Sequence, residues 1–190
     1  MAASEPIRCK KDLKALAFYF LKRGELRNYA MVVLGVCTAL RISDLLRLRW
    51  EDVYDSETGH MKTHLEVTER KTKKKRVIAL NRKAAEALLL LKRESKSEYI
   101  FSNRRKTEKP ISRVQAWRIL RGAAENLRLT GRISCHSLRK TFGYFARKNR
   151  GITPELLMRI YNHSDFSVTL RYLGITQDEL DHVYLSTPLF

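Results

Sequence analysis

One interruption in an otherwise helical pattern constrains the fold of this chain most strongly. Apolar residues recur at helical spacing over 12–24, and residues 26–40 are apolar on nearly every side, as in a buried helix. Over 50–80, two clusters of turn-forming residues, 55–59 and 69–74, separate three short β-like runs. The helical pattern then resumes. The sequence therefore predicts a mainly α fold with a small three-stranded antiparallel β-sheet inserted early in the chain.

Helix-capping residues mark where several of the predicted helices begin. Ser43 is placed to cap a short helix and Asn81 to cap a longer one. Thr153 is placed to cap a third, with Pro154 at its first position, where the missing N–H of proline costs nothing. The sequence contains no internal repeat and no low-complexity linker, and we expect a single domain over 1–190.

The excess of positive charge indicates the class of partner. The chain carries 38 Lys and Arg against 20 Asp and Glu, a formal net charge of +18 at pH 7. This exceeds what solubility requires and predicts a polyanionic partner, either nucleic acid or an acidic membrane. No apolar stretch is long enough to span a bilayer, and residues 1–11 lack the apolar core of a signal peptide. We therefore expect a cytoplasmic protein that binds nucleic acid and has no membrane partner.

Neither the cysteines nor the histidines form a metal-binding pattern. The three cysteines, Cys9, Cys37 and Cys135, are odd in number and widely spaced, which predicts neither a disulfide framework nor a zinc site. His60 and His64 are four residues apart, but they fall in a turn-and-strand pattern rather than in a helix. We expect no metal and no cofactor, and a reducing compartment.

Residues 135–148 place two chemically different faces on one predicted helix. One face is an apolar stripe that consists of Leu138, Phe142, Phe145 and Ala146. The other face is polar and positively charged and consists of His136, Arg139, Gly143 and Arg147. Because glycine has no Cβ atom, another group can approach this face closely at Gly143. The alternatives are a solvated surface with an incidental histidine and a functional site.

Four short motifs, in order along the chain, resemble the catalytic domain of the tyrosine recombinases, also called phage integrases. TALRISDLLRLRW is similar to the first arginine motif of that family, and ERKTKKKRVIAL is similar to its lysine hairpin. CHSLRKTF matches its His-x-x-Arg helix, and NHSDFSVTLRYLGI matches its histidine-then-tyrosine motif. Each motif alone is weakly specific, but the four in order are strongly so. The resemblance extends from Pro6 to the end of the chain.

The resemblance implies an enzyme that breaks and rejoins DNA through a covalent 3′-phosphotyrosine intermediate without a metal or a cofactor. Arginine forks can stabilise the charge that develops on the phosphate, and a histidine can take the proton of the attacking tyrosine. A lysine can protonate the leaving 5′ oxygen. By resemblance the catalytic residues are Arg41 and Arg139 on the phosphate, Lys71 as general acid, His136 as general base or proton relay, His163 as a phosphate hydrogen-bond donor and Tyr172 as nucleophile.

Three further positions bear on this assignment. Asp44, one helical turn beyond Arg41, is expected to orient that arginine. The family usually has glycine where this chain has Ala39, in the turn that delivers Arg41, and where it has Asn162. Asparagine adopts positive φ more readily than most residues other than glycine, so we expect the joint before His163 to survive.

Other basic residues are expected to contact the DNA backbone with little sequence specificity. They are Arg70, Lys73, Lys74, Lys75, Arg76, Arg104, Arg105 and Arg147. Lys73, Lys74 and Lys75 are also alternatives to Lys71 as the general acid. Tyr184 is the alternative nucleophile, because it too lies in a predicted C-terminal helix.

The resemblance implies site-specific DNA recombination or integration on a mobile genetic element of a bacterium or a phage. The expected partners are double-stranded DNA at specific recombination sites and further copies of the chain, assembled on DNA as a tetramer at the nucleoid. The tail over 176–190 is expected to dock on a neighbouring protomer or, alternatively, to pack on its own domain. We expect no N-terminal core-binding domain within this chain, because the resemblance begins at the catalytic domain.

Two other functions share part of this pattern. A catalytically inactive or accessory DNA-binding module would keep the positive charge but would not need all six catalytic groups. A type IB topoisomerase-like enzyme would use the same chemistry but would relax DNA instead of exchanging strands. An RNA-binding protein is disfavoured, because the sequence lacks aromatic stacking motifs.

Overall fold

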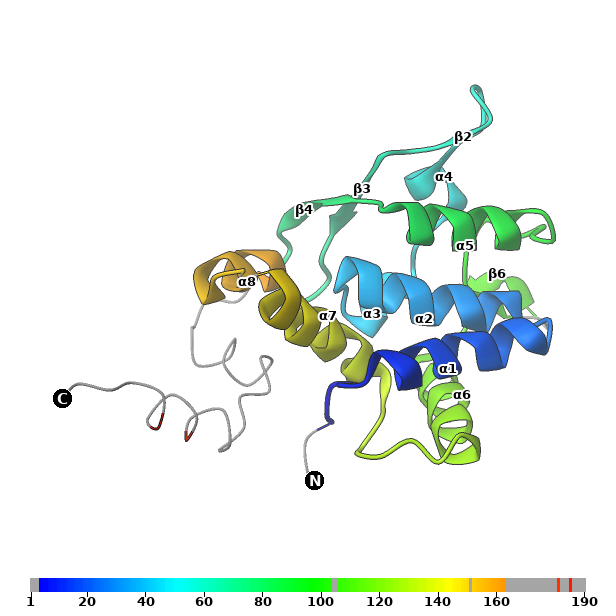
Figure 1. Ribbon diagram of the computed structural model, residues 1–190. Helices are drawn as coiled ribbons and strands as arrows, with labels where there is room; N and C mark the ends of the chain where they lie inside the picture. The colour runs from blue at the N-terminus through cyan, green and yellow to red at the C-terminus, as the bar shows by residue number, and fades with distance from the viewer. Residues whose placement is uncertain (1–3, 104–105, 151, 163–180, 182–184, 186–190) are drawn as a thin grey trace.

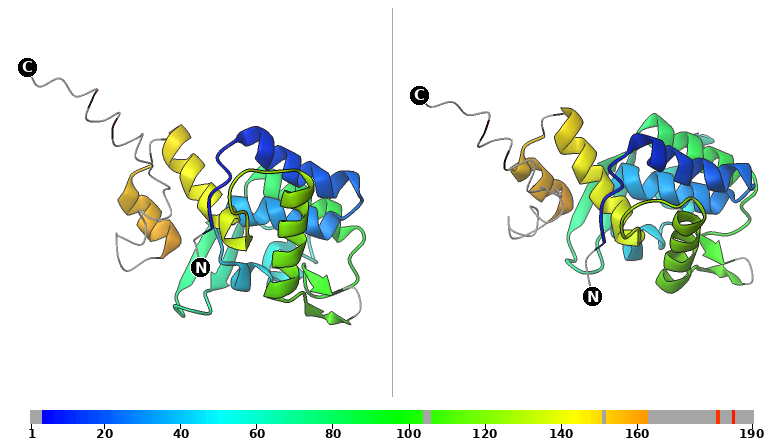
Figure 2. Two further views of the ribbon diagram at one scale, coloured as in Figure 1. Left: turned by 90° about the horizontal axis from the view of Figure 1, so that it is seen from below. Right: turned by 60° about the horizontal axis from the view of Figure 1, so that its bottom comes forward.

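Helix α2 (Leu26–Thr38) lies at the centre of the fold in the computed structural model, which describes residues 4–103, 106–150, 152–162, 181 and 185 (Figure 1). The other described helices of at least four residues are α1 (Lys10–Lys22), α3 (Ile42–Leu45), α4 (Trp50–Val53), α5 (Arg82–Lys92), α6 (Arg113–Asn126), α7 (Cys135–Arg150) and α8 (Pro154–Tyr161). Because α2 is apolar on nearly every side, three of them, α1, α5 and α7, pack against it. In both views of Figure 2, α7 lies between α6 and α8.

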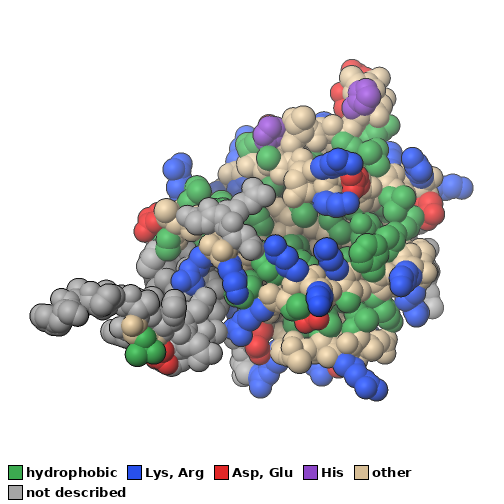
Figure 3. Space-filling view, viewed as in Figure 1, with side chains coloured by type: hydrophobic (Ala, Val, Ile, Leu, Met, Phe, Trp, Pro, Cys, Tyr) green, Lys and Arg blue, Asp and Glu red, His purple; other side chains and the backbone are tan. Residues whose placement is uncertain are grey.

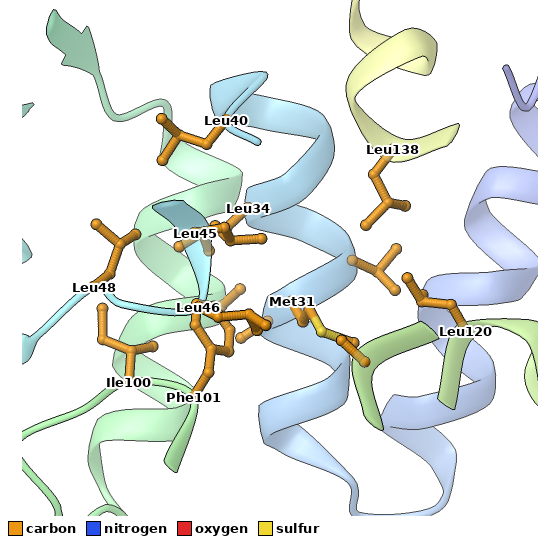
Figure 4. Close-up of a cluster of buried hydrophobic side chains, with 14 of the residues drawn as sticks. Met31, Leu34, Leu40, Leu45, Leu46, Leu48, Ile100, Phe101, Leu120 and Leu138 are labelled. Atoms are coloured by element: carbon orange, nitrogen blue, oxygen red, sulfur yellow. The ribbon is translucent and has the colours of Figure 1, made fainter. Parts of the chain in front are cut away.

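Leucine side chains from several elements surround α2. Figure 4 shows Leu138 pointing from α7 toward α2, with Leu45 and Phe101 on the other side of the helix. Helices α2 and α7 approach closely at Gly35, where an added Cβ atom would lie 2.6 Å from Leu138 Cδ1. Truncating a buried leucine such as Leu138 typically costs about 2–5 kcal/mol. This packing fixes α7, and with it the polar residues of α7, against the centre of the fold.

The β-structure consists of antiparallel pairs of strands. The pairs are β1 (Tyr54–Asp55) with β2 (His60–Met61), β3 (His64–Thr68) with β4 (Lys75–Ala79), and β5 (Ser102–Asn103) with β6 (Lys106–Pro110). A mainly α fold with small antiparallel β-structure is thus confirmed, but the single three-stranded sheet is not observed among the described residues. The predicted middle run is broken at Lys62, whose N–H donates to the Val53 carbonyl, and at Thr63, whose carbonyl accepts from Leu80. Because Lys62 bonds to Val53 and Thr63 bonds to Leu80, the first half of the run, β2, pairs with β1, and the second half, β3, pairs with β4.

The helix caps were predicted correctly at two positions and wrongly at one. Asn81 accepts a hydrogen bond from the Ala84 N–H at 2.9 Å, and Thr153 caps α8 with Pro154 in its first turn. Ser43 does not cap a helix, because α3 already begins at Ile42 and Ser43 lies inside it. A serine caps only from the residue that precedes the first helical turn.

Helix α8 covers the face of α7 that the sequence pattern leaves bare at Gly143. The Tyr161 ring lies over this glycine, and an added Cβ atom there would collide with the Tyr161 hydroxyl. Tyr161 packs with Ala39, Ala146 and Leu157 in a second, smaller apolar cluster. The glycine is therefore needed for close approach, as predicted, but the group that approaches is part of the protein itself.

Candidate active site

Arg41 lies at the corner between α2 and α3. Helix α2 ends at Thr38, and Ala39 turns the chain in a left-handed conformation with φ 53° and ψ 26°. The backbone is extended at Arg41, the residue that precedes α3. A residue other than glycine is uncommon in the left-handed region. The turn that delivers Arg41 thus forms even though alanine occupies the position where the resemblance led us to expect glycine.

Glu69 is the carboxylate that Arg41 contacts. Arg41 Nη1 lies 2.5 Å from Glu69 Oε2, and the Arg41 side chain is 16% exposed. Glu69 is fully buried and also accepts hydrogen bonds from Arg76 Nη1 at 3.0 Å, Thr72 Oγ1 at 2.8 Å and Asn162 Nδ2 at 3.2 Å. Burial raises the pKa of Glu69, but hydrogen bonds from Thr72, Arg76 and Arg41 outweigh this effect and lower the pKa to about 2. The carboxylate is therefore ionised at neutral pH.

The Asp44 carboxylate is not among the described partners of the Arg41 side chain, although its spacing predicts that it orients this arginine; the two residues are joined through the backbone, where the Asp44 N–H donates to the Arg41 carbonyl at 2.9 Å. Asp44 Oδ1 instead accepts a hydrogen bond from the backbone N–H of Arg70 at 3.1 Å. Arg41 is the residue before α3, and its side chain pairs with Glu69 instead. The buried Asp44 carboxylate therefore holds the turn between β3 and β4.

Lys71 lies in that turn between β3 and β4, where the sequence places it. Its side chain is exposed, as are those of its three alternatives, Lys73, Lys74 and Lys75, so exposure does not distinguish them. Arg76 differs from these lysines, because its side chain is 10% exposed and forms an ion pair with Glu69. A contact between Arg76 and DNA stays a prediction, but this side chain, unlike the lysines, is already engaged by Glu69.

Arg139 is buried in α7, where the sequence pattern predicts an open polar face. Its Nη1 donates to the Ala39 carbonyl and its Nη2 donates to the Tyr161 carbonyl at 2.7 Å, and the residue is 1% exposed. Both carbonyls lie at the C-terminal ends of helices, α2 and α8, where the backbone dipoles favour a positive charge. Arg139 thus ties α7 to the corner that carries Arg41.

His136 lies in the first turn of α7, near the positive charges of the site. Desolvation lowers the pKa of His136, and the charges of Arg139, Lys140, Arg41 and Lys71 lower it further. The neutral imidazole, which can accept a proton, is favoured as a result. The charges of Arg41, Lys71 and Arg139 thus act on His136, and the bond from Arg139 to the Ala39 carbonyl joins α7 to the corner that carries Arg41.

The joint after α8 brings Asn162, the first residue of the last motif, into contact with Glu69. Asn162 adopts the left-handed conformation with φ 55°, as predicted for an asparagine at this position. Its Nδ2 donates to Glu69 Oε2 and also to Thr72 Oγ1 at 3.3 Å. The other two predicted catalytic residues, His163 and Tyr172, lie outside the described residues. So do Tyr184, the alternative nucleophile, and two predicted DNA contacts, Arg104 and Arg105. Most of the predicted tail over 176–190 also lies outside them.

A groove of about 880 Å³, not predicted from the sequence, opens beside His136. Helix α6 lines it with Arg113, Trp117 and Arg121. Trp117 is 41% exposed, and Arg121 Cζ lies 5.4 Å from the centre of its ring. The spacing of four residues, which places all three on one helical face, is visible in the sequence and could have revealed this surface. Lys and Arg side chains also spread over the face shown in Figure 3, where Asp and Glu are fewer.

The residues that the structure describes include no group of three His, Cys, Asp or Glu side chains that could hold a metal ion. The same part of the chain has no helix that is both long enough and apolar enough to cross a membrane.

Comparison with known proteins identifies the family. The sequence pattern of the phage integrase family matches residues 10–179. The chain belongs to this family. The probable integrase/recombinase YoeC of Bacillus subtilis (strain 168) is 41% identical over 182 residues, which cover 95% of this chain and 94% of YoeC. The tyrosine recombinase XerD of Halalkalibacterium halodurans is 27% identical over 168 residues, which cover 84% of this chain and 53% of XerD.

Solved structures of recombinases share the fold. XerA recombinase matches with a TM-score of 0.78 at 20% identity, over 100% of this chain and 68% of XerA. XerH recombinase bound to palindromic difH, in a post-cleavage complex, matches with a TM-score of 0.74 at 17% identity, over 98% of this chain and 54% of XerH. The tyrosine recombinase catalytic-domain fold is confirmed, and the chain is a tyrosine-type recombinase by family. It spans about half the length of XerD and XerH.

Proposed function

We propose that this phage integrase cleaves and rejoins double-stranded DNA at specific recombination sites through a covalent 3′-phosphotyrosine intermediate. The observation that carries the proposal is that Arg139 bonds the corner that carries Arg41, and that the charges of Arg41, Lys71 and Arg139 all lower the pKa of the nearby His136, so that these groups share one region of the fold. These residues are Arg41, Lys71, His136 and Arg139.

Proton transfer is assigned to three residues. The Tyr172 hydroxyl oxygen forms a bond to phosphorus, and the bond between phosphorus and the 5′ oxygen breaks. His136, whose lowered pKa favours its neutral form, accepts the tyrosine proton, and Lys71 donates a proton to the leaving 5′ oxygen. Attack by a different 5′ hydroxyl reverses these bond changes and joins a new pair of strands. The exchange therefore consumes no nucleotide cofactor.

Charge stabilisation is assigned to three further groups. Arg41 and Arg139 offset the negative charge that develops on the phosphate oxygens, and His163 donates a hydrogen bond to one of them. Preorganised positive groups of this kind stabilise the transition state most when they need not move during the reaction. The backbone carbonyls that bond Arg139 and the carboxylate that bonds Arg41 support this assignment, because they restrict the movement of both guanidinium groups.

The DNA would contact the exposed lysines of the β3–β4 turn and the groove beside α6. Arg113 and Arg121 can bind phosphates, and Trp117 offers an exposed ring between them. A solved lambda integrase is a dimer bound to a core site, which supports an oligomer on DNA; we propose a tetramer for this chain. In this assembly the tail over 176–190 docks on a neighbouring protomer. Relatives such as YoeC are bacterial, which supports action at the bacterial nucleoid.

Covalent capture from DNA of random sequence tests the proposed chemistry and finds the target site in the same experiment. The chain is incubated with nicked duplexes of randomised sequence, denatured, and the DNA that stays attached to protein is sequenced. We expect the parent and the matched control Tyr184→Phe to capture a defined sequence, whereas Tyr172→Phe binds the same DNA and captures none. Adduct in Tyr172→Phe would contradict the assignment of the nucleophile.

The same assay separates the alternatives. An accessory DNA-binding module would bind DNA and form no adduct in any variant. A metal-dependent nuclease would lose cleavage in excess chelator and regain it with magnesium, whereas we expect the integrase reaction to continue in chelator. Exchange of strands between two captured sites, rather than relaxation of supercoiled plasmid alone, distinguishes a recombinase from a type IB topoisomerase.

A further inference from the structure

Glu69 connects three segments that lie far apart in the sequence. The first carries Arg41, the second is the turn that carries Lys71, and the third is the joint that precedes His163. Its hydrogen-bond donors in these segments are Arg41, Thr72 and Asn162, and Arg76 in β4 is a further donor. A single buried carboxylate thus contacts Arg41 itself, the turn that carries Lys71 and the residue that precedes His163.

The contact with Arg41 occupies only one corner of the guanidinium group. Arg41 Nη1 lies 2.5 Å from Glu69 Oε2, and within the described residues Nε and Nη2 of Arg41 have no partner. A guanidinium binds two phosphate oxygens through a planar pair of N–H groups. Glu69 can therefore fix the plane of Arg41 while the edge formed by Nε and Nη2 is left to bind the phosphate.

The burial of Glu69 is consistent with a role that depends on its charge. A carboxylate with no exposed surface is costly to bury unless donors satisfy its oxygens, and two apolar residues often stabilise a protein as well as a buried ion pair does. Donors on three separate segments satisfy both Glu69 oxygens and fix the position of each donor. A residue that only stabilised the β3–β4 hairpin would not need a contact with Arg41.

We propose that Glu69 is a positioning residue for recombination. It holds the Arg41 guanidinium against the turn that carries Lys71 and against the joint before His163. The inference rests on the proposed function, because it assigns Arg41 to the scissile phosphate. Glu69 itself does not touch the DNA and acts through Arg41.

The test compares two substrates in the variant Glu69→Gln, which keeps the shape of the side chain and removes its charge. One substrate is a captured DNA site with an ordinary phosphodiester, and the other carries a methylphosphonate at the scissile position, without the negative charge that Arg41 neutralises. We expect Glu69→Gln to slow adduct formation on the phosphodiester on the order of tenfold, and less on the methylphosphonate. Arg41→Ala should show the same preference more strongly.

Two control variants lie in β3, the strand that ends one residue before Glu69. Leu65→Ala removes a fully buried side chain from β3 and should slow both substrates by the same factor, in proportion to the loss of folded protein. Glu66→Gln removes an exposed carboxylate from β3 and should change neither rate. If Glu69→Gln slows both substrates equally, as Leu65→Ala does, Glu69 is a structural residue and the proposal is wrong.

A second measurement needs no DNA. The backbone N–H of Arg70 donates to Asp44, so its hydrogen exchange reports whether the turn stays docked, and that of Asn162 donates to the Arg159 carbonyl at the end of α8, so its exchange reports whether the joint keeps its conformation. We expect Glu69→Gln to raise exchange at both sites at least tenfold relative to the β3–β4 ladder. Unchanged exchange at both sites overturns the proposal. A parent chain that forms no adduct contradicts the proposed function instead, and exchange still decides whether Glu69 holds these segments.

Discussion

The candidate site contains two buried charges, and the protein holds them in different ways. Side chains hold the anion: Glu69 accepts from Arg41, Thr72, Arg76 and Asn162. Backbone carbonyls hold the cation: Arg139 donates to Ala39 and Tyr161. We call these two arrangements the Glu69 centre and the Arg139 centre. The first depends on charges that a mutation or a change of pH can remove, whereas the second depends on helix ends that persist as long as the helices do.

This difference suggests a division of roles within the site. The Arg139 centre joins α2, α7 and α8, which are fixed by the packing of apolar side chains. The Glu69 centre connects that framework to an exposed turn, which carries Lys71. We infer that the Arg139 centre determines whether the site exists at all, and that the Glu69 centre determines how well its groups are aligned.

Replacing Arg139 should have the largest effect. In Arg139→Lys the charge is kept, but a single ammonium group cannot reproduce a planar fork that bonds two carbonyls. We expect the free energy of unfolding, measured by chemical denaturation, to fall by about 3–5 kcal/mol, as when a buried charge loses its partners. Covalent capture should fall at least a hundredfold, on the order of the loss when one charge-stabilising donor is removed from an active site.

The exposed Arg159 in α8 provides the control for this substitution. Arg159→Lys makes the same chemical change without disturbing a described hydrogen bond of its side chain, and its free energy of unfolding should stay within about 0.5 kcal/mol of the parent. If Arg139→Lys is as stable as Arg159→Lys, the backbone carbonyls of Ala39 and Tyr161 do not require the planar fork of an arginine.

Acid should weaken the Glu69 centre and leave the Arg139 centre charged. The pKa of Glu69 falls from an ordinary 4.5 to about 2 on folding, so its contribution to stability is complete above pH 4.5 and is lost as the pH falls through 2. At about 1.4 kcal/mol for each pKa unit, the contribution is about 3 kcal/mol. Denaturation of the parent and of Glu69→Gln between pH 6 and pH 2.5 should give unfolding free energies that converge as the pH falls.

Glu66→Gln serves as the reference for this titration, because Glu66 is an exposed carboxylate in the same hairpin. Its unfolding free energy should stay parallel to that of the parent over the whole range. Curves for the parent and Glu69→Gln that stay equally far apart at every pH would show that the ionised form of Glu69 does not stabilise the fold.

Gly143→Ala should disturb the Arg139 centre without reaching the Glu69 centre. The added Cβ atom would collide with the hydroxyl of Tyr161, which donates to the Arg139 carbonyl at 2.8 Å. Overpacking of this kind costs about 1–3 kcal/mol. Denaturation at neutral pH should show this loss, while the acid-dependent component assigned to Glu69 should be unchanged. A smaller acid-dependent component in Gly143→Ala would show that the two centres are coupled.

The sequence predicted the parts of the fold that local patterns determine. The caps at Asn81 and Thr153, the buried character of α2 and the positive φ of Asn162 all depend on residues within a few positions of each other. The pairing of the strands was predicted less well, because the break at Lys62 depends on hydrogen bonds to Val53 and to a different strand. Local pattern alone does not show which neighbour a strand will find.

The same limit applies to the site. The motifs led to Arg41, His136 and Arg139 as catalytic residues, which stays a prediction, and Asp44 was chosen as the partner of Arg41 because it is near in sequence, whereas Arg41 pairs with Glu69. Glu69 was overlooked because it stands at the start of a run of basic residues that reads as a solvated turn. Its contacts with Arg41 and Asn162 span 28 and 93 residues, and only the folded chain brings them together.

The smallest change in the free energy of unfolding is expected at the two residues of these centres that have left-handed backbone conformations. Ala39 (φ 53°) and Asn162 (φ 55°) both follow the end of a helix, and glycine would relieve the strain at either position. In Ala39→Gly the relief is offset by the loss of a buried methyl group, worth about 0.8 kcal/mol, and by the greater freedom of the unfolded chain. We expect a net change below about 0.5 kcal/mol, since the carbonyl that accepts from Arg139 is kept.

Asn162→Gly also loses the hydrogen bonds to Glu69 and Thr72, so denaturation should show a loss of about 1 kcal/mol or more there. Equal effects at the two positions would mean that side chains and backbone hold the two centres alike.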